Sequence, residues 1–161
     1  IKDGMIDLSE VGLSEEEIKE ISQIYIVACG SAYHVGVAAQ YVMEDLARIP
    51  VRVELASEFR YRNPILDPKG LVVIISQSGE TADSLAALRE SKKQGVKTLG
   101  IVNVIGSSIA READNVYYGR TGDCSCDNKS IQHTVDRSLY TCNSVRKDQR
   151  TDYRRTVCRI Y

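Results

Sequence analysis

Apolar and polar positions follow one another along the chain in a pattern that predicts five strands separated by helices. The predicted strands are short, aliphatic-rich runs, and they cover residues 24–28, 51–55, 71–75, 96–102 and 116–118. Apolar residues at helical spacing lie between them, at residues 35–47, from about 82 to 94, and at 107–113. We therefore expect an α/β fold, a three-layer, doubly wound parallel sheet of about five strands.

Local signals set the ends of these elements. Ser14–Glu17 has the pattern of a capping box and begins a short entry helix. Pro50 ends the long helix before it, because the residue that precedes a proline is pushed out of the α region. Gly95 suits the position just after the last turn of the next long helix. Residues 56–70 contain two prolines, and we expect a loop there with a helical turn at 57–61.

The central stretch of the chain runs from Leu71 to Thr81. Five consecutive aliphatic residues suit a parallel strand that is buried on both faces. Three hydroxyl residues follow them, namely Ser76, Ser78 and Thr81. They surround Gly79, which permits a tight turn, and a helix that begins near Ala82 points its free N–H groups into that turn. This arrangement predicts an anion site, and phosphate is the obvious ligand.

Three Gly- and Ser-containing turns follow predicted strands: Cys29–His34, Ser76–Thr81 and Asn103–Ser108. The carboxyl ends of parallel strands meet at one edge of a sheet, which is where doubly wound folds bind ligands. Taken singly, each turn is explained by ordinary capping and turn residues. Together they offer neutral donors rather than fixed cations, which suits a sugar phosphate whose charge is met by helix N-termini and hydroxyls.

Charge and composition exclude several classes of protein. The 161 residues are enough for one domain with a real core. The net charge of −1 and the pI near 6.2 give no argument for binding nucleic acid or an anionic membrane. No segment approaches the roughly 20 apolar residues of a membrane span. We expect a soluble, cytoplasmic protein with no nucleic-acid or membrane partner, and the start at Ile1 suggests a piece of a longer chain.

The cysteines do not form a metal-binding pattern. Cys29 is the one cysteine in residues 1–118, and the other four share the C-terminal region: Cys124, Cys126, Cys142 and Cys158. Their spacing fits no usual zinc site, and His133 does not complete one. We expect neither a metal nor a cofactor.

Four segments resemble one known family: residues 28–34, 56–59, 75–83 and 103–114. They are similar to the first sugar isomerase (SIS) domain of the glutamine–fructose-6-phosphate aminotransferases, the glucosamine-6-phosphate synthases. The resemblance covers about residues 18–118. It implies a flavodoxin-like SIS fold, binding of fructose 6-phosphate, and an enzyme that makes glucosamine 6-phosphate with ammonia released from glutamine in a separate domain. It also implies a homodimer that pairs through these domains.

The resemblance assigns substrate-binding roles to two turns. The residues that match the phosphate-binding turn are Ser76, Gln77, Ser78 and Thr81, and those that match the sugar-binding turn are Cys29, Gly30 and Ser31. Ala32 replaces a hydroxyl residue of the family, a loss of about 1 kcal/mol if one neutral hydrogen bond is missing. No catalytic residue is assigned, because the acid, base and lysine of the family lie in later parts of the enzyme. Cys29 and His34 have ordinary structural explanations, and Glu80 is explained by stabilisation of the helix that follows it.

Two other classes of protein remain open. One is a non-catalytic SIS module that senses a phosphosugar in a transcriptional regulator, since such modules use the same turn at residues 76–81. The Cys29 turn favours the enzyme, and no basic recognition helix is present. The other is a Rossmann nucleotide binder, which the absence of a G-x-G-x-x-G after every predicted strand disfavours.

The character of the sequence changes after Tyr118. Residues 119–161 contain no Ala, Glu, Phe, Met or Pro, and they carry nine Lys or Arg against five Asp. This composition buries little surface, so we divide the chain into an SIS domain at 1–118 and an irregular tail at 119–161 that is non-native or disordered. With permitted codons, residues 119–133 read one base later become Ala-Gly-Pro-Glu-Ile-Ala-Val-Ala-Thr-Thr-Lys-Ala-Tyr-Ser, which resembles the next segment of the family. We therefore expect a frameshift, which DNA sequencing of the gene tests.

Overall fold

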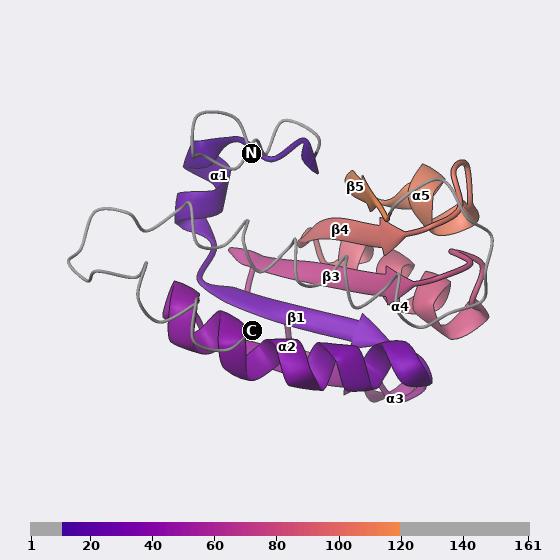
Figure 1. Ribbon diagram of the computed structural model, residues 1–161, viewed down its shortest axis with the longest axis horizontal. Coiled ribbons are helices and arrows are strands. Elements are labelled where there is room, and N and C mark those ends of the chain that lie inside the picture. The colour runs from indigo at the N-terminus through magenta and orange to yellow at the C-terminus, as the bar shows by residue number, and fades with distance from the viewer. Residues whose placement is uncertain (1–10, 120–161) are drawn as a thin grey trace, which may run out of the picture.

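The computed structural model describes residues 11–119, which form a parallel sheet with helices on both faces (Figure 1). The strands are β1 (Gln23–Ala28), β2 (Val51–Leu55), β3 (Gly70–Ser76), β4 (Lys97–Val102) and β5 (Asn115–Tyr118). They lie in the order β2-β1-β3-β4-β5, and every neighbouring pair is parallel. The predicted doubly wound α/β fold is confirmed. The predicted tail lies outside the described residues, except for Gly119.

Within residues 11–119, four helices connect these strands, and α1 (Glu15–Glu20) precedes β1. The connecting helices are α2 (Ser31–Ala47), α3 (Ala56–Arg62), α4 (Ala82–Lys93) and α5 (Ser108–Glu112). Figure 1 shows α2 in front of the strands and α4 behind them. Within residues 11–119, no helix combines the length and the apolar character that crossing a membrane requires.

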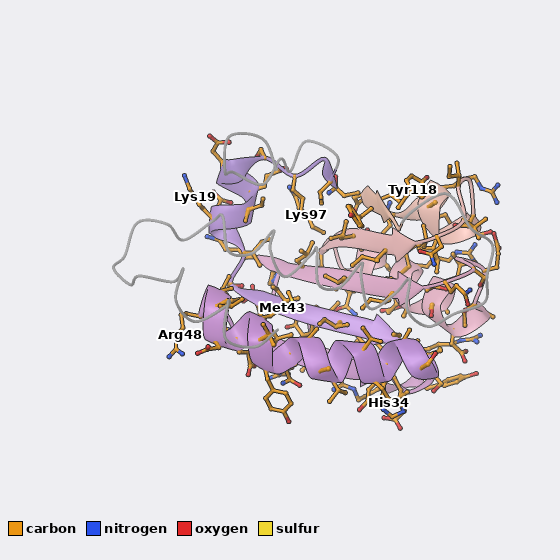
Figure 2. The ribbon with its side chains drawn as sticks, viewed as in Figure 1. Lys19, His34, Met43, Arg48, Lys97 and Tyr118 are labelled. Carbon is orange, nitrogen blue, oxygen red and sulfur yellow. The ribbon has the colours of Figure 1, made fainter. Side chains whose placement is uncertain are left out.

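The central strands are buried on both faces, and this explains their continuous aliphatic sequences. Ile24 and Ile26 of β1 belong to a cluster that also contains Met43 of α2, which is labelled in Figure 2. Tyr25 and Val27, the alternate residues of the same strand, belong to a second cluster formed with α3, α4 and α5. Because successive side chains of a strand point to opposite faces, β1 contributes to both cores.

Helix α3 is longer than the helical turn predicted at 57–61. Ala56 and Phe59 lie one helical turn apart, and both are fully buried in the second cluster. Asn63 adopts a left-handed conformation after the last turn, and Pro64 follows it. Burial of Phe59, the one phenylalanine of the chain, stabilises a helix that the turn-forming composition of residues 56–70 did not indicate.

The predicted capping box begins α1, at the amino edge of the sheet. Ser14 Oγ accepts a hydrogen bond from the Glu17 N–H at 3.2 Å, and the Glu17 carboxylate accepts one from the Ser14 N–H at 2.8 Å. Glu17 also pairs with Lys97 at the start of β4, and Figure 2 shows Lys97 beside α1. The Lys97 ammonium, followed by the Ser14 N–H, lowers the pKa of Glu17 to about 2.

This lowered pKa predicts how Glu17 contributes to stability at different pH values. The carboxylate is favoured in the folded chain, so its contribution is complete above pH 4.5 and is lost as the pH falls toward 2. We expect Glu17→Gln to lower the free energy of unfolding at pH 7, and the gap from wild type to narrow between pH 4.5 and 2. Denaturant unfolding across this range measures both effects, and a gap that does not change with pH would contradict the assignment.

Candidate functional site

The candidate site lies where β1 and β3 end side by side. The chain leaves β1 toward α2 and leaves β3 toward α4, and these helices cover opposite faces of the sheet (Figure 1). This is the switch point of the strand order, where doubly wound sheets bind their ligands. Both helices therefore begin at the same edge, and the first N–H groups of a helix have no partner within it.

Gly30 makes the first turn so short that α2 begins at Ser31. Its φ of +58° and ψ of −132° are accessible to glycine, whereas a Cβ there meets no atom within 4 Å. Glycine is therefore required at position 30 by the backbone conformation, whereas the space around it would admit a side chain. The sequence predicted a turn through His34, but residues 31–34 belong to the helix, since nothing after Gly30 disfavours helical geometry. Gly30 brings no side chain to cap α2.

The β3–α4 turn, residues Gln77–Thr81, is held by its own hydroxyl groups. Ser76 Oγ is almost fully buried, accepts a hydrogen bond from the Gly79 N–H at 3.1 Å, and lies 3.3 Å from Thr81 Oγ1. Ser78 Oγ accepts one from the Glu80 N–H at 3.2 Å. Thr81 precedes the first residue of α4, but its hydroxyl faces Ser76 and does not cap the helix. Gln77 and Ser78 are exposed to solvent.

Gly79 is required by both its conformation and its surroundings. Its φ is +68°, and a Cβ at this position would lie 2.1 Å from Ser107 Oγ and 2.5 Å from Ser107 Cβ. Ser107 is itself buried, and its hydroxyl is the one buried side-chain polar atom within residues 11–119 that has no hydrogen-bond partner. The β3–α4 turn and the start of α5 are thus in direct contact at Gly79.

We expect Gly79→Ala to destabilise the fold by more than a backbone effect alone. Gly95→Ala is the matched control, because Gly95 has a φ of +75° but no atom within 4 Å of its would-be Cβ. Left-handed strain costs on the order of 1 kcal/mol at each site, and the clash with Ser107 adds to it at Gly79 alone. Denaturant unfolding measures the difference, and equal losses for the two variants would show that contact with Ser107 is unimportant.

The third predicted turn, residues 103–108, is hydrogen-bonded directly to the β3–α4 turn. The Asn103 N–H donates to the Gln77 carbonyl at 3.2 Å, and the Ile109 N–H donates to the Gly79 carbonyl at 3.0 Å. Both the N–H and the hydroxyl of Ser108 donate to the Glu80 carboxylate at 2.7 Å. These two bonds, the hydroxyl first, lower the pKa of Glu80.

This geometry corrects the interpretation of Glu80. The sequence assigned its charge to the start of the helix that follows it, α4. The carboxylate instead caps α5, because Ser108 is brought against the β3–α4 turn by the pairing of β3 with β4. Because the Glu80 carboxylate accepts the Ser108 N–H at the start of α5, this N–H is already bonded within the protein.

The structure also connects the first turn to the second. Ser84, in the first turn of α4, donates its hydroxyl to Cys29 Sγ at 3.7 Å. Cys29 is half-buried, and Ser31 is exposed beside it. Sequence reasoning missed Ser84, although a hydroxyl three residues after Thr81 falls on the same side of the helix. Ala32 is buried in the first cluster, below the surface of the turn.

The remaining candidates lie outside this group. His34 is exposed on α2 (Figure 2). Its ring packs edge-on against that of Tyr33, with centroids 5.5 Å apart. Arg60 of α3 pairs with Asp83 in the first turn of α4 at 3.1 Å. In the described part of the chain, no group of three or more His, Cys, Asp and Glu residues is arranged to hold a metal ion. The edge of the sheet therefore offers hydroxyls, backbone N–H groups and helix dipoles, which suit an anionic ligand.

Comparison with known proteins identifies one matching family model and relatives that share one name. A family model described as the SIS domain matches residues 17–140. The glutamine–fructose-6-phosphate aminotransferase (isomerizing) of Clostridium tetani is 56% identical over 117 residues, which are 73% of this chain and 19% of the relative. The protein of the same name from Caldanaerobacter subterraneus subsp. tengcongensis is 53% identical over 122 residues, or 76% of this chain and 20% of the relative.

A solved structure agrees with these relatives. The C-terminal domain of glucosamine-fructose-6-phosphate aminotransferase from Francisella tularensis has a TM-score of 0.79 and 37% sequence identity, and the match covers 90% of this chain and 41% of that domain. The present chain spans about a fifth of the length of the curated relatives.

Proposed function

Because the chain belongs to the SIS domain family, we propose that the ends of β1 and β3 bind a sugar phosphate. We further propose that the chain is the first SIS domain of a glutamine–fructose-6-phosphate aminotransferase and that its ligand is fructose 6-phosphate. One observation carries the proposal. Three hydroxyl residues surround a tight turn at the start of α4, and no side chain of Thr81 or Gly30 caps the two helices at this switch point.

The two turns have different roles in this proposal. The phosphate binds at the β3–α4 turn, through Ser76, Gln77, Ser78 and Thr81. The sugar binds at the start of α2, through Cys29, Gly30 and Ser31. Hydroxyl, amide and backbone donors at a helix start stabilise a phosphate without a fixed cation, and the open space around Gly30 leaves room for the backbone to approach the sugar closely.

We propose that the chemistry of the whole enzyme draws on parts beyond the matched segment, which is 19–20% of each relative. The matched 117 residues are 73% of this chain but 19% of the Clostridium tetani relative, so that relative is nearly four times as long as this chain. The carboxylate of Glu80, which belongs to the β3–α4 turn, is bonded to Ser108. We therefore propose that the chain holds the substrate while groups from other domains transfer the amino group and isomerise the sugar.

The relatives favour the enzyme over the regulator. The two relatives described above are aminotransferases at 53–56% identity to this chain. The turn at residues 76–81 does not by itself distinguish the enzyme from the regulator, because both classes use it. We also propose a cytoplasmic location and pairing of two copies through this domain. Sedimentation of the 161-residue chain tests the pairing, and a monomer at every concentration would contradict it.

We expect fructose 6-phosphate to bind and to perturb the amide signals of residues 29–31 and 76–81 in NMR titration of the chain. Ser78→Ala should weaken binding about tenfold or more, since a hydrogen bond to a charged group contributes roughly 1.5–3 kcal/mol. Ser22→Ala is the matched control, because it removes an exposed hydroxyl at the opposite edge of the sheet, where Ser22 bonds Asp67. Fructose should bind more weakly, for lack of a phosphate. Equal binding of a nucleotide, or no shift in either turn, would reject the proposal.

The chain alone should form no glucosamine 6-phosphate. Fructose 6-phosphate and ammonia supply the substrates in this assay, so its result does not depend on the hydrolysis of glutamine. A coupled assay for glucosamine 6-phosphate, with a complete aminotransferase as the positive control, measures it. Sustained product formation by the 161-residue chain would show that the catalytic groups are present after all.

A further inference from the structure

We propose that Glu80 positions the β3–α4 turn for anion binding by anchoring it to residues 103–109. This inference rests on the proposed sugar-phosphate site. Glu80 does not touch the ligand in this proposal. It acts through Ser108, with which its carboxylate makes two hydrogen bonds of 2.7 Å.

The first step concerns where the hydrogen-bond acceptors of the turn point. The Gln77 carbonyl, the Gly79 carbonyl and the Glu80 carboxylate all accept hydrogen bonds from residues 103–109. An oxygen that accepts from this segment is held against it. These three acceptors, which would repel a phosphate, are thus engaged by residues 103–109. The hydroxyls of Ser76 and Thr81 lie 3.3 Å from each other.

The second step concerns the charge of Glu80 itself. A carboxylate two residues from Ser78 would oppose binding of an anion if it were free to turn toward it. The hydrogen bonds from Ser108 lower its pKa, and the nearby guanidinium of Arg111 contributes to the same shift. The negative charge is therefore stabilised at the start of α5 and kept away from the turn that binds the ligand.

The third step concerns the rigidity of the anchor. Arg89 of α4 makes two hydrogen bonds of 2.7 Å to the Glu112 carboxylate at the end of α5. Lys92, one turn later, pairs with Asp114 at 2.8 Å. Helix α5 is thus fastened to the body of α4, while Glu80 fastens the start of α4 to the start of α5. The turn is held from both sides.

The test uses inorganic phosphate and fructose 6-phosphate as probes of the 161-residue chain, by NMR titration at pH 7.5. Removing a negative charge near an anion site strengthens binding if the charge acts alone. We expect the opposite for Glu80→Ala, a loss of affinity of about threefold or more, because the loss of positioning outweighs the loss of repulsion. Equal or tighter binding by Glu80→Ala would overturn the inference.

Ser108 gives a second test that leaves every charge in place. Ser108→Ala should weaken phosphate binding, and Ser108→Thr, which keeps the hydroxyl, should restore it. In Glu80→Ala, the Ser108→Ala change should cause no further loss, since the two residues act through each other. If Glu80→Ala does not fold, the two Ser108 variants decide, and unchanged binding by Ser108→Ala overturns the inference.

Two controls separate positioning from other effects. Asp83→Asn removes a charge from the first turn of α4 without touching residues 103–109, and its phosphate binding should be unchanged or tighter. Glu17→Gln weakens the fold at the distant α1 and should leave phosphate binding unchanged. A loss in either control equal to that of Glu80→Ala would overturn the inference. Absence of binding by the wild-type chain would instead reject the sugar-phosphate function.

Discussion

The structure depends on one constraint, which is that β1 and β3 are neighbours whose connections leave toward opposite faces of the sheet. Crossovers between parallel strands are right-handed, so the order β2-β1-β3-β4-β5 places α2 on one face and α4 on the other. Two helices then start at the same point of the same edge. This placement brings the first turns of two helices, which are far apart in sequence, to one edge of the sheet, where Ser84 of α4 contacts Cys29 before α2.

The strands and the switch point could be predicted from the sequence because their causes are local or periodic. Residues 71–75 are aliphatic without interruption, since β3 is covered on both faces. The tight turn at Gly79 could also be predicted, because glycine and hydroxyl residues are typical of a turn that precedes a helix. The length of the helix at 56–62 was predicted too short. Its stability comes from burying Phe59 in the cluster that includes residues of α4, and the neighbouring residues in the sequence do not indicate this burial.

The partner of Glu80 could not be predicted for a related reason. A carboxylate just before a helix is explained well enough by that helix, and the competing helix start belongs to a segment 28 residues later. Only the pairing of β3 with β4 brings Ser108 within reach. Ser84 was missed because its contact with Cys29 links two turns separated by 55 residues. Sequence patterns identify the groups that a site contains, and tertiary packing decides which of them face the ligand and which face one another.

The hydroxyls of the β3–α4 turn have a consequence for the protonation state of the phosphate that we propose binds there. The second pKa of a phosphate monoester is near 6, so both its singly and doubly charged forms are present close to neutral pH. A serine or threonine hydroxyl can donate a hydrogen bond to an unprotonated phosphate oxygen or rotate to accept one from a P–OH group, whereas a lysine ammonium can only donate. In the proposed site, the hydroxyls of Ser76, Ser78 and Thr81 would therefore accommodate either form with the same side chains.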